Sequence, residues 1–409
     1  MSITLVISPE SYPWDLAKEQ TFLAPEIEVL SKEPISLVMA PQRIGGQRLA
    51  VPTGVEVDES LAREVAGLRR AELVIRAART SLVAEEFVRR GRALSSLRAL
   101  KRLVDYAGRA QHAADWARRF VRARRLEGSR VIFASYWWGP VTTGVGLAAA
   151  TLPELRVASR AHGFDLYEDR SEPAYLPCRH RALAVLHGLF PDSETGTRWL
   201  KRTYTKLPRV ETARLGVANP GVQNRPSADG TLRVVTCSLQ VPVKRLELLV
   251  DAVAHAGGSG ARIEWTHHGT GPLQSSLEAR ARRLFPSNVR VTFAGYSTQK
   301  ELFEWYRTHP ADVFVNVSQS EGTPVSIMEA IACGIPVLAT AVGGNPEICT
   351  ARNGLLVGEN PTAEEVGAAL LRFAPGASTG WREGSLAIWR EKYDAASNYR
   401  GWLETLRSL

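Results

Sequence analysis

The chain has 409 residues, 44% of them apolar and 23% charged, and a formal net charge of +9. That length exceeds what one hydrophobic core usually serves, so we expect two domains of ordinary size. No run of 18 apolar residues occurs and the first residues lack the basic and apolar regions of a secretion signal, so we expect a cytoplasmic protein without a spanning helix.

The predicted strands of the first half are short apolar runs at 3–7, 35–39, 131–135, 156–160 and near Leu189. Continuous apolar strands alternating with helical patterns predict a parallel sheet covered on both faces. The first run is followed by no G-x-G-x-x-G, and no G-x-x-x-x-G-K-[ST] occurs anywhere, which disfavours NAD and P-loop chemistry.

The stretch from Arg63 to Arg130 holds 18 Lys or Arg residues against 7 Asp or Glu, a net +11. Its pattern is rich in Arg, Ala and Leu and predicts successive amphipathic helices. A basic helical face favours an anionic partner such as a lipid surface, a phosphorylated substrate or nucleic acid. A solvated face with no partner explains the charge equally well.

Chemistry-bearing residues follow two of the predicted strands. His162 and Asp165 come directly after the strand at 156–160, where the carboxyl end of a parallel strand can face a ligand. In the second half, Lys244 and Arg245 come soon after the strand at 232–237, from which they could reach a diphosphate. A solvated Lys-Arg pair at a helix start is the simpler interpretation of the second pattern.

The second half contains six predicted strands, at 232–237, 262–268, 289–295, 312–317, 335–340 and 354–357. Gly269 and Gly271 follow the second of these and suit a tight turn near a ligand. A Pro/Gly/Asn-rich stretch at 207–233 is the expected linker. We therefore expect two doubly wound domains at 1–210 and 211–385, facing across a cleft, and a final segment 386–409 that returns to the first domain.

Two carboxylates flank a predicted helix in SQSEGTPVSIMEAIACGIPVLATAVGG, residues 318–344. Thr323 suits the cap and Pro324 the first turn, so we expect a helix from Pro324 to Cys333 that stops at Gly334. Glu321 and Glu329 are eight residues apart, which corresponds to at most ~12 Å of helix axis. That spacing suits the two ends of one elongated ligand, with free helix amides between them for an anion, although two solvated glutamates are an equal alternative.

The segment 312–357 resembles the donor-binding region of glycosyltransferase family 4, the retaining enzymes of the GT-B fold with two Rossmann-like domains. Segments 160–167, 234–253, 265–273 and 291–306 share the resemblance, in particular to the branch that assembles bacterial capsular, exopolysaccharide and lipopolysaccharide glycans. The resemblance covers nearly all of the second domain and, more thinly, the first from Glu26 onward.

The resemblance implies a role for each matching position. Glu321 would hold hydroxyls of the transferred sugar and Glu329 those of the ribose. Lys244, with Arg245, would neutralise the leaving phosphate. His162 matches a first-domain histidine near the sugar and acceptor and would be catalytic with Glu321 and Lys244, while Arg160 and Asp165 would lie on the acceptor side. The remaining donor-binding positions are Gly269, Gly295, Tyr296 and the backbone of Gly322, Thr323, Pro324, Val325 and Ser326. Two departures concern this machinery: Leu239 stands where the family often has an arginine, and the first loop, 10–22, lacks the usual glycines.

The implied reaction is retaining transfer from a UDP- or GDP-sugar to a glycan or a polyprenyl-diphosphate-linked acceptor, at the inner face of the membrane. No cofactor or metal is expected, because Lys244 and helix amides would take the role of a divalent cation. The four cysteines also show no zinc-binding spacing. The rival functions are a sugar-nucleotide epimerase and a non-enzymatic nucleic-acid- or membrane-binding protein. The paired carboxylates disfavour both, and no nucleic-acid partner is expected.

Overall fold

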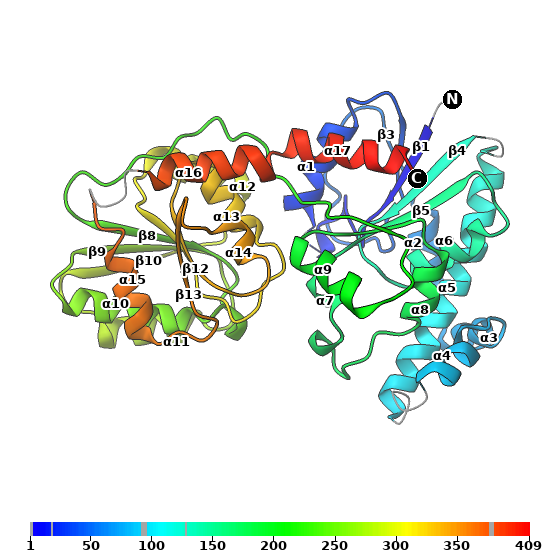
Figure 1. The fold of residues 1–409 in the computed structure, drawn as a ribbon, viewed down its shortest axis with the longest axis horizontal. Helices are drawn as coiled ribbons and strands as arrows, with labels where there is room; N and C mark the ends of the chain where they lie inside the picture. The colour runs from blue at the N-terminus through cyan, green and yellow to red at the C-terminus, as the bar shows by residue number, and fades with distance from the viewer. Residues whose placement is uncertain (1–2, 18, 91–95, 127–128, 376–379) are drawn as a thin grey trace. The chain divides into compact units, whose positions relative to one another are not determined.

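The computed structural model describes residues 3–17, 19–90, 96–126, 129–375 and 380–409 (Figure 1). The chain divides into two compact units: unit 1 comprises Met1–Arg214 with Tyr399–Leu409, and unit 2 comprises Leu215–Asn398. The first division falls within the stretch 207–233. The last segment differs from its expected bounds, since residues up to Asn398 stay with unit 2, where Trp389 Nε1 donates to Val217 O and Asn398 Nδ2 to Leu215 O.

Unit 1 contains a seven-stranded parallel sheet with the strand order β3-β2-β1-β4-β5-β6-β7. Its strands are β1 (Ile3–Ser8), β2 (Ser36–Met39), β3 (Val55–Val57), β4 (Arg130–Ser135), β5 (Leu155–Ala161), β6 (Gly188–Pro191) and β7 (Arg209–Val210). The five predicted strands are confirmed. The edge strands β3 and β7 were not predicted, because three and two residues are too few to show a period.

The helices of unit 1 cover the two faces of this sheet. They are α1 (Gln20–Leu30), α2 (Ser60–Gly67), α3 (Arg70–Ala78), α4 (Leu82–Arg90), α5 (Leu97–Ala123), α6 (Pro140–Ala149), α7 (Gly163–Leu166), α8 (Arg179–Val185) and α9 (Glu194–Thr203), with 3-10 turns η1 (Asp15–Ala17) and η3 (Glu168–Arg170). The described part of the basic stretch is mainly helical, as expected, and contributes to α2, α3, α4 and α5, whereas residues 91–95 and 127–128 of the stretch lie outside the described residues. Buried Phe133, Trp116 and Val157 lie in the main core.

Unit 2 contains a six-stranded parallel sheet with the strand order β10-β9-β8-β11-β12-β13. Its strands are β8 (Leu232–Cys237), β9 (Ile263–His268), β10 (Val289–Gly295), β11 (Val313–Asn316), β12 (Val337–Thr340) and β13 (Gly354–Val357). All six predicted strands are confirmed. Every residue of β11 and β12 is buried, which explains why their sequences are continuous apolar runs.

The helices of unit 2 are α10 (Leu246–Gly258), α11 (Gln274–Leu284), α12 (Gln299–Thr308), α13 (Val325–Ala332), α14 (Asn345–Ile348), α15 (Ala363–Leu371) and α16 (Trp381–Ile388), with a 3-10 turn η4 (Pro242–Lys244) and a π-helical turn η5 (Trp389–Tyr393). Helix α17 (Ala395–Arg407) begins in unit 2 and ends in unit 1. None of the described helices combines the length and the apolar composition that a bilayer crossing requires.

The two sheets share one topology. Numbered within each unit, both begin with the strand order 3-2-1-4-5-6, the Rossmann order, so the predicted fold of two Rossmann-like domains is confirmed. In such a sheet the crossover direction reverses between the first and fourth strands, and ligands bind outside their carboxyl ends. In unit 1 this place lies beyond β1 and β4, and in unit 2 it lies beyond β8 and β11.

Candidate functional site

The loops beyond β8 and β11 meet through an ion pair. Lys244 Nζ, at the end of η4, lies 2.6 Å from Glu321 Oε1. The same oxygen accepts hydrogen bonds from Asn316 Nδ2 at 3.0 Å and from Ser318 Oγ at 2.6 Å. Glu321 is buried, so its carboxylate is fixed by several donors rather than solvated. Asn316 and Ser318 were missed by the sequence reasoning, and their place at the end of β11 was the available signal.

Arg245 holds the neighbouring loops together. Its backbone is left-handed, with φ 49°, and its guanidinium donates to the carbonyls of Val317 at 2.7 Å and of Ser318 and Glu359 at 2.8 Å. Three carbonyl partners occupy this side chain. In this arrangement Arg245 supports the loop that carries Glu321, and its expected reach toward a phosphate stays a prediction.

The helix between the two glutamates starts one residue later than expected. Helix α13 runs from Val325 to Ala332, and its N-cap is Pro324, whose backbone is extended. The expected cap, Thr323, makes no capping hydrogen bond, because its buried Oγ1 has no hydrogen-bond partner among the described residues. Gly334 ends the helix as expected, with φ 75°.

The start of α13 leaves backbone donors free. Pro324 has no N–H, which corrects its place among the expected diphosphate-binding amides. The N–H groups of Gly322, Thr323, Val325 and Ser326 donate to no acceptor in the described part of the chain. Unpaired amides at a helix N-terminus favour an anion.

A glycine pair after β12 fixes the loop that carries Glu321. Gly344 N donates to Gly322 O at 2.8 Å. Gly343 has φ 53°, and a Cβ there would lie 2.0 Å from Glu321 O. Only glycine therefore permits this approach of the two backbones. The pair lies within the quoted motif, but no local pattern indicates which loop it meets.

Glu329 is buried within α13 and is not on the solvated helix surface that the simpler interpretation expected. Its Oε1 accepts a hydrogen bond from Gln299 Nε2 at 2.7 Å. Burial raises the pKa of Glu329 to about 7, and the Gln299 hydrogen bond opposes this shift. Glu329 is therefore a carboxyl that a further hydrogen-bond donor or cation would readily ionise.

The loops after β9 and β10 are joined at the same edge of the sheet. Gly269 N donates to Gly295 O at 2.7 Å, and the two glycines form an antiparallel bridge. Tyr296 follows and is exposed. His268 Nδ1 lies 2.9 Å from Ser297 Oγ, which ties the second loop to the end of β9. The structure thus places Gly269, Gly295 and Tyr296 beyond the carboxyl ends of their strands.

In unit 1, His162 lies in an aromatic cluster at the end of β5. Its ring stacks on Tyr136 with centroids 4.9 Å apart and contacts Trp137 at 4.4 Å. Neither ring nitrogen has a hydrogen-bond partner among the described residues. Burial and the nearby Arg160 charge lower the pKa of His162 to about 3, so the ring is neutral at physiological pH.

Asp165 organises the backbone beside His162. Its carboxylate accepts the N–H groups of His162 at 2.6 Å and of Trp138 at 2.8 Å. Burial raises the pKa of Asp165 to about 7, although both bonds favour the ionised form. Arg160 does not lie on an accessible acceptor side as expected. It is fully buried, lies 3.3 Å from Glu26, and stacks over Trp402 at 4.6 Å.

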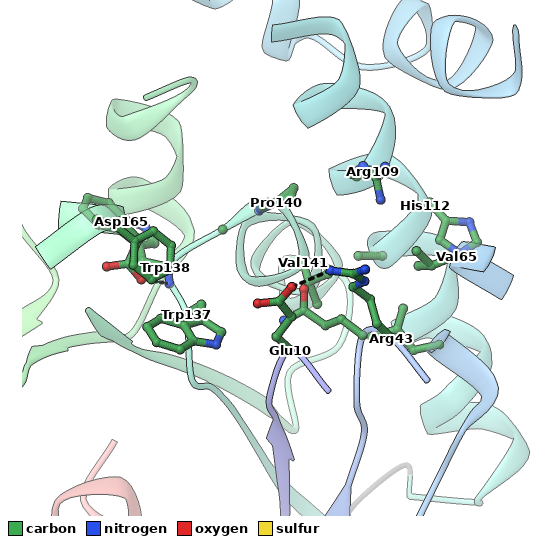
Figure 2. A pocket seen from close by; sticks show the side chains of 15 residues that line it. Glu10, Arg43, Val65, Arg109, His112, Trp137, Trp138, Pro140, Val141 and Asp165 are labelled. Atoms are coloured by element: carbon green, nitrogen blue, oxygen red, sulfur yellow. Dashed lines mark hydrogen bonds and ion pairs between the residues drawn. The ribbon is translucent and has the colours of Figure 1, made fainter. Parts of the chain in front are cut away.

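A pocket of about 240 Å³ opens beyond the carboxyl ends of β1 and β4 (Figure 2). Its lining includes Glu10 and Arg43, which form an ion pair at 2.8 Å, together with Trp137, Phe164 and Asp165. The aromatic rings provide apolar faces beside charged and polar groups. Such a mixture suits a hydroxyl-rich ligand with one less polar face. Within the described residues, no cluster of His, Cys, Asp or Glu could hold a metal ion.

Comparison with known proteins finds a family model that matches most of unit 2. Residues 232–374 match the family model described as glycosyl transferases group 1. The putative colanic acid biosynthesis glycosyltransferase WcaL of Salmonella typhimurium is 27% identical over 243 residues, which cover 56% of this chain and 59% of WcaL. D-inositol 3-phosphate glycosyltransferase 2 of Catenulispora acidiphila is 38% identical over 136 residues, 33% of this chain and 29% of that protein.

Solved structures extend the likeness of fold to the whole chain. The lipopolysaccharide outer core galactosyltransferase WaaB superposes with a TM-score of 0.68 at 13% identity, over 98% of this chain and 99% of that one. Anabaena HepE in complex with UDP superposes with a TM-score of 0.65 at 14% identity, over 100% of both chains. Residues 232–374 of this chain therefore match the glycosyl transferases group 1 family model, within a chain that has the GT-B fold.

Proposed function

We propose that this protein is a retaining glycosyltransferase that moves a sugar from a UDP- or GDP-sugar to a glycan or polyprenyl-diphosphate-linked acceptor in cell-surface polysaccharide assembly. The observation that carries the proposal is the Lys244–Glu321 pair beyond β8 and β11, next in sequence to a helix with unpaired amides. The similarity to WcaL and the UDP bound by HepE support the reaction class and the donor.

The donor would bind along α13. The unpaired amides of Gly322, Thr323, Val325 and Ser326 would donate hydrogen bonds to the diphosphate, and Lys244 would neutralise its charge. Glu321 would accept hydroxyl hydrogens of the sugar, and Glu329 those of the ribose. Because Glu321 holds the Lys244 ammonium at 2.6 Å, the cation is positioned before the donor arrives, as electrostatic stabilisation of a leaving group requires.

The transfer would exchange one bond for another on the same face of the sugar. The bond between C1 and the phosphate oxygen breaks while the acceptor oxygen bonds to C1, and the acceptor proton passes to the leaving diphosphate. Neutral His162 could accept a hydrogen bond near the reacting groups but would not carry a charge. Lys244 and the helix amides would stabilise the diphosphate without a metal ion.

The acceptor would occupy the pocket of unit 1. Trp137 and Phe164 would pack against the apolar face of a sugar ring, and Glu10, Arg43 and Asp165 would bind its hydroxyls. We therefore assign Asp165 to the acceptor side, whereas the buried Arg160 contacts Glu26 and Trp402 instead.

The test is a screen of UDP- and GDP-sugars for slow hydrolysis by the purified protein, repeated with a chelator. We expect one nucleotide sugar to be hydrolysed, with retention at C1 of the sugar released or transferred and without loss of activity in EDTA. Epimerised nucleotide sugar without transfer would support the rival epimerase. No turnover and no nucleotide binding would overturn the proposal.

A further inference from the structure

Two helices of unit 1 carry apolar side chains on their outer faces. In α3, Leu73 and Ala77 are buried, whereas Ala71, Val74, Ile75 and Ala78 are exposed at the i, i+3, i+4 and i+7 spacing of one helix face. In α4, Leu82 is buried, and Ala84, Phe87 and Val88 are exposed at the same spacing. A solvated helix normally reverses this pattern and presents its polar side outward.

These exposed side chains are concentrated in one part of the chain. Of the twelve exposed large apolar side chains in the described residues, five lie between positions 74 and 97 and are 46% to 87% exposed. They are Val74, Ile75, Phe87, Val88 and Leu97, and Leu97 begins α5. We call this set the α3–α4 patch. Single exposed apolar residues need no explanation, but a group on adjoining helices indicates an interaction surface.

The helices behind the α3–α4 patch are firmly held. Leu82, Ala99, Leu103 and Tyr106 form a separate small core beneath α3 and α4. Gly108 of α5 allows close approach, since a Cβ there would lie 2.4 Å from Leu73 O. The patch is therefore the outer face of a packed structure and not an unfolded segment.

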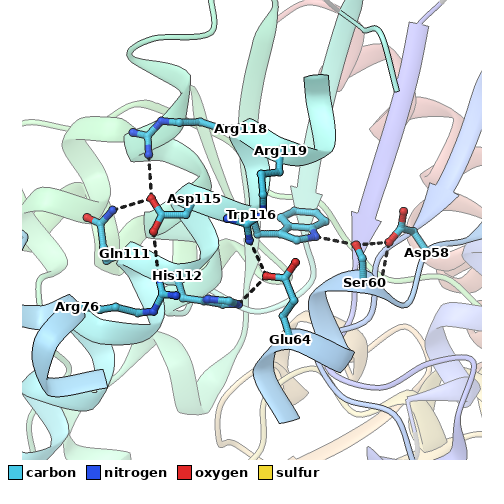
Figure 3. Close-up of polar contacts among 10 residues, drawn as sticks. All are labelled: Asp58, Ser60, Glu64, Arg76, Gln111, His112, Asp115, Trp116, Arg118 and Arg119. Atoms are coloured by element: carbon cyan, nitrogen blue, oxygen red, sulfur yellow. Dashed lines mark hydrogen bonds and ion pairs between the residues drawn. The ribbon is translucent and has the colours of Figure 1, made fainter. Parts of the chain in front are cut away.

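Polar contacts also join α5 to α3 and to α2 (Figure 3). Arg76 of α3 pairs with Asp115 of α5 at 2.9 Å, and Arg119 of α5 pairs with Glu64 of α2 at 2.6 Å. Asp115 and Glu64 belong to the basic stretch, so these two pairs are already counted in its net +11. Three other arginines of the stretch pair with acids outside it: Arg90 with Glu168, Arg98 with Glu172 and Arg124 with Glu56. The charge available to a partner is consequently smaller than the sequence count.

Cations that remain available lie beside the apolar residues. Arg69, Arg70, Arg79, Arg89 and Lys101 are exposed, and none of them makes an ion pair with another described residue. Glu72 is the exposed acidic residue of α3. Exposed apolar side chains bordered by unpaired cations are complementary to the interface of an anionic bilayer, where apolar groups enter the acyl boundary and cations meet lipid phosphates.

We propose that the α3–α4 patch docks this protein on an anionic lipid bilayer by shallow insertion of Val74, Ile75, Phe87, Val88 and Leu97. The inference goes beyond the transfer reaction and does not depend on it. It differs from docking by charge alone, which the sequence suggested, because apolar insertion leaves a part of the binding that salt does not remove.

The test is co-sedimentation of the full chain with vesicles of phosphatidylglycerol and phosphatidylcholine, compared with pure phosphatidylcholine, at low and high salt. We expect binding to the anionic vesicles that high salt weakens without abolishing. Ile75→Asp combined with Val88→Asp should weaken it at least about tenfold, or about 1.4 kcal/mol. Arg79→Glu combined with Arg89→Glu should weaken it mainly at low salt.

Two variants on α11 of unit 2 provide matched controls, since Leu284 and Arg283 are exposed on a helix outside the patch. Leu284→Asp and Arg283→Glu should leave vesicle binding unchanged. No binding at low salt, or equal loss in the controls, would overturn the proposal. A dimer of the parent that Ile75→Asp with Val88→Asp converts to a monomer, without vesicle binding, would show a protein interface instead.

Donor hydrolysis separates this proposal from the proposed function. The patch variants should hydrolyse the nucleotide sugar like the parent, because none of the substituted residues lies in the proposed donor or acceptor site. Vesicle binding without any turnover would support the docking surface and reject the transferase. Turnover without vesicle binding would support the transferase and reject the docking surface.

Discussion

Lys244 shows how two distant residues of the sequence become one chemical unit. It comes 77 positions before Glu321, and its ammonium nevertheless lies 2.6 Å from that carboxylate. The sequence placed each residue after a strand but could not pair them, because the pairing depends on β8 and β11 being neighbours in the sheet. Leu239, which stands where an arginine is frequent in the family, is exposed and offers no replacement charge.

We predict that Lys244→Ala lowers the rate of sugar transfer about 100-fold, because it removes a positioned cation from the leaving diphosphate. The measurement is kcat at saturating donor, with nucleotide affinity determined by calorimetry. Lys206→Ala is the control, since Lys206 is an exposed lysine of unit 1 that lies outside both proposed sites. A Lys244→Ala enzyme within a few-fold of the parent would remove Lys244 from the mechanism.

Glu329 provides a prediction about stability and pH. Burial raises its pKa from 4.5 in the unfolded chain to about 7 in the fold, so the folded state binds the proton more tightly. Its contribution is fully present below pH 4.5 and is lost as the pH rises through about 7. Glu329→Gln keeps an oxygen that can accept the Gln299 hydrogen bond but cannot ionise. The variant should therefore lack roughly 3 kcal/mol of the parent's pH-dependent change in the free energy of unfolding.

The measurement for Glu329 is the free energy of unfolding in denaturant at pH 5 and pH 8, for parent and variant. Asp165 has a similarly raised pKa, about 7, and retains its own dependence in both proteins. The difference between them therefore isolates Glu329. Identical slopes in parent and variant would show that Glu329 is not a buried ionisable carboxyl.

At the scale of helices and strands, contacts between loops determine the geometry of the site. The sequence predicted α13 to within a residue or two, because helix propensity and the stop at Gly334 are local signals. It missed the true cap, since Pro324 in an extended conformation ends the preceding loop. It also placed Arg160 on the acceptor side, whereas the burial of Arg160 against Glu26 and Trp402 follows only from the packing of α1 and α17 on β5.

Gly343 tests whether the loop after β12 positions Glu321. Gly343→Ala should destabilise the protein by about 1–2 kcal/mol, because its φ of 53° is strained for an L residue, and the new Cβ would displace the Glu321 backbone. We expect transfer to fall at least about tenfold as the carboxylate moves. Gly358→Ala is the matched control, since a Cβ at Gly358 meets nothing within 4 Å. Equal activity of the two variants would refute the positioning role.

At the scale of the whole chain, the two units repeat one topology with different loops. The strands were predictable because their buried residues form continuous apolar runs, and the alternation with helices implied parallel sheets. The pocket of unit 1 was not predictable, because Glu10, Arg43 and Trp137 come from three separate loops with no shared motif. Local sequence patterns therefore predict the fold, whereas the prediction of a site built from several loops also requires the strand order.

This repetition predicts a division of labour between the units. Trp137→Ala removes an aromatic face from the pocket of unit 1 and should raise the KM for acceptor about tenfold or more, with donor hydrolysis and UDP or GDP affinity unchanged.

Glu329→Ala in unit 2 should weaken nucleotide binding by roughly 1–3 kcal/mol, because a hydrogen-bonding carboxylate is lost. Since the two residues belong to different units and are proposed to bind different substrates, their effects on transfer should add in the double variant to within about 0.5 kcal/mol. The measurements are calorimetric nucleotide affinity and initial rates with acceptor varied at saturating donor. Loss of nucleotide affinity on changing Trp137 would show instead that the unit 1 pocket takes part in donor binding.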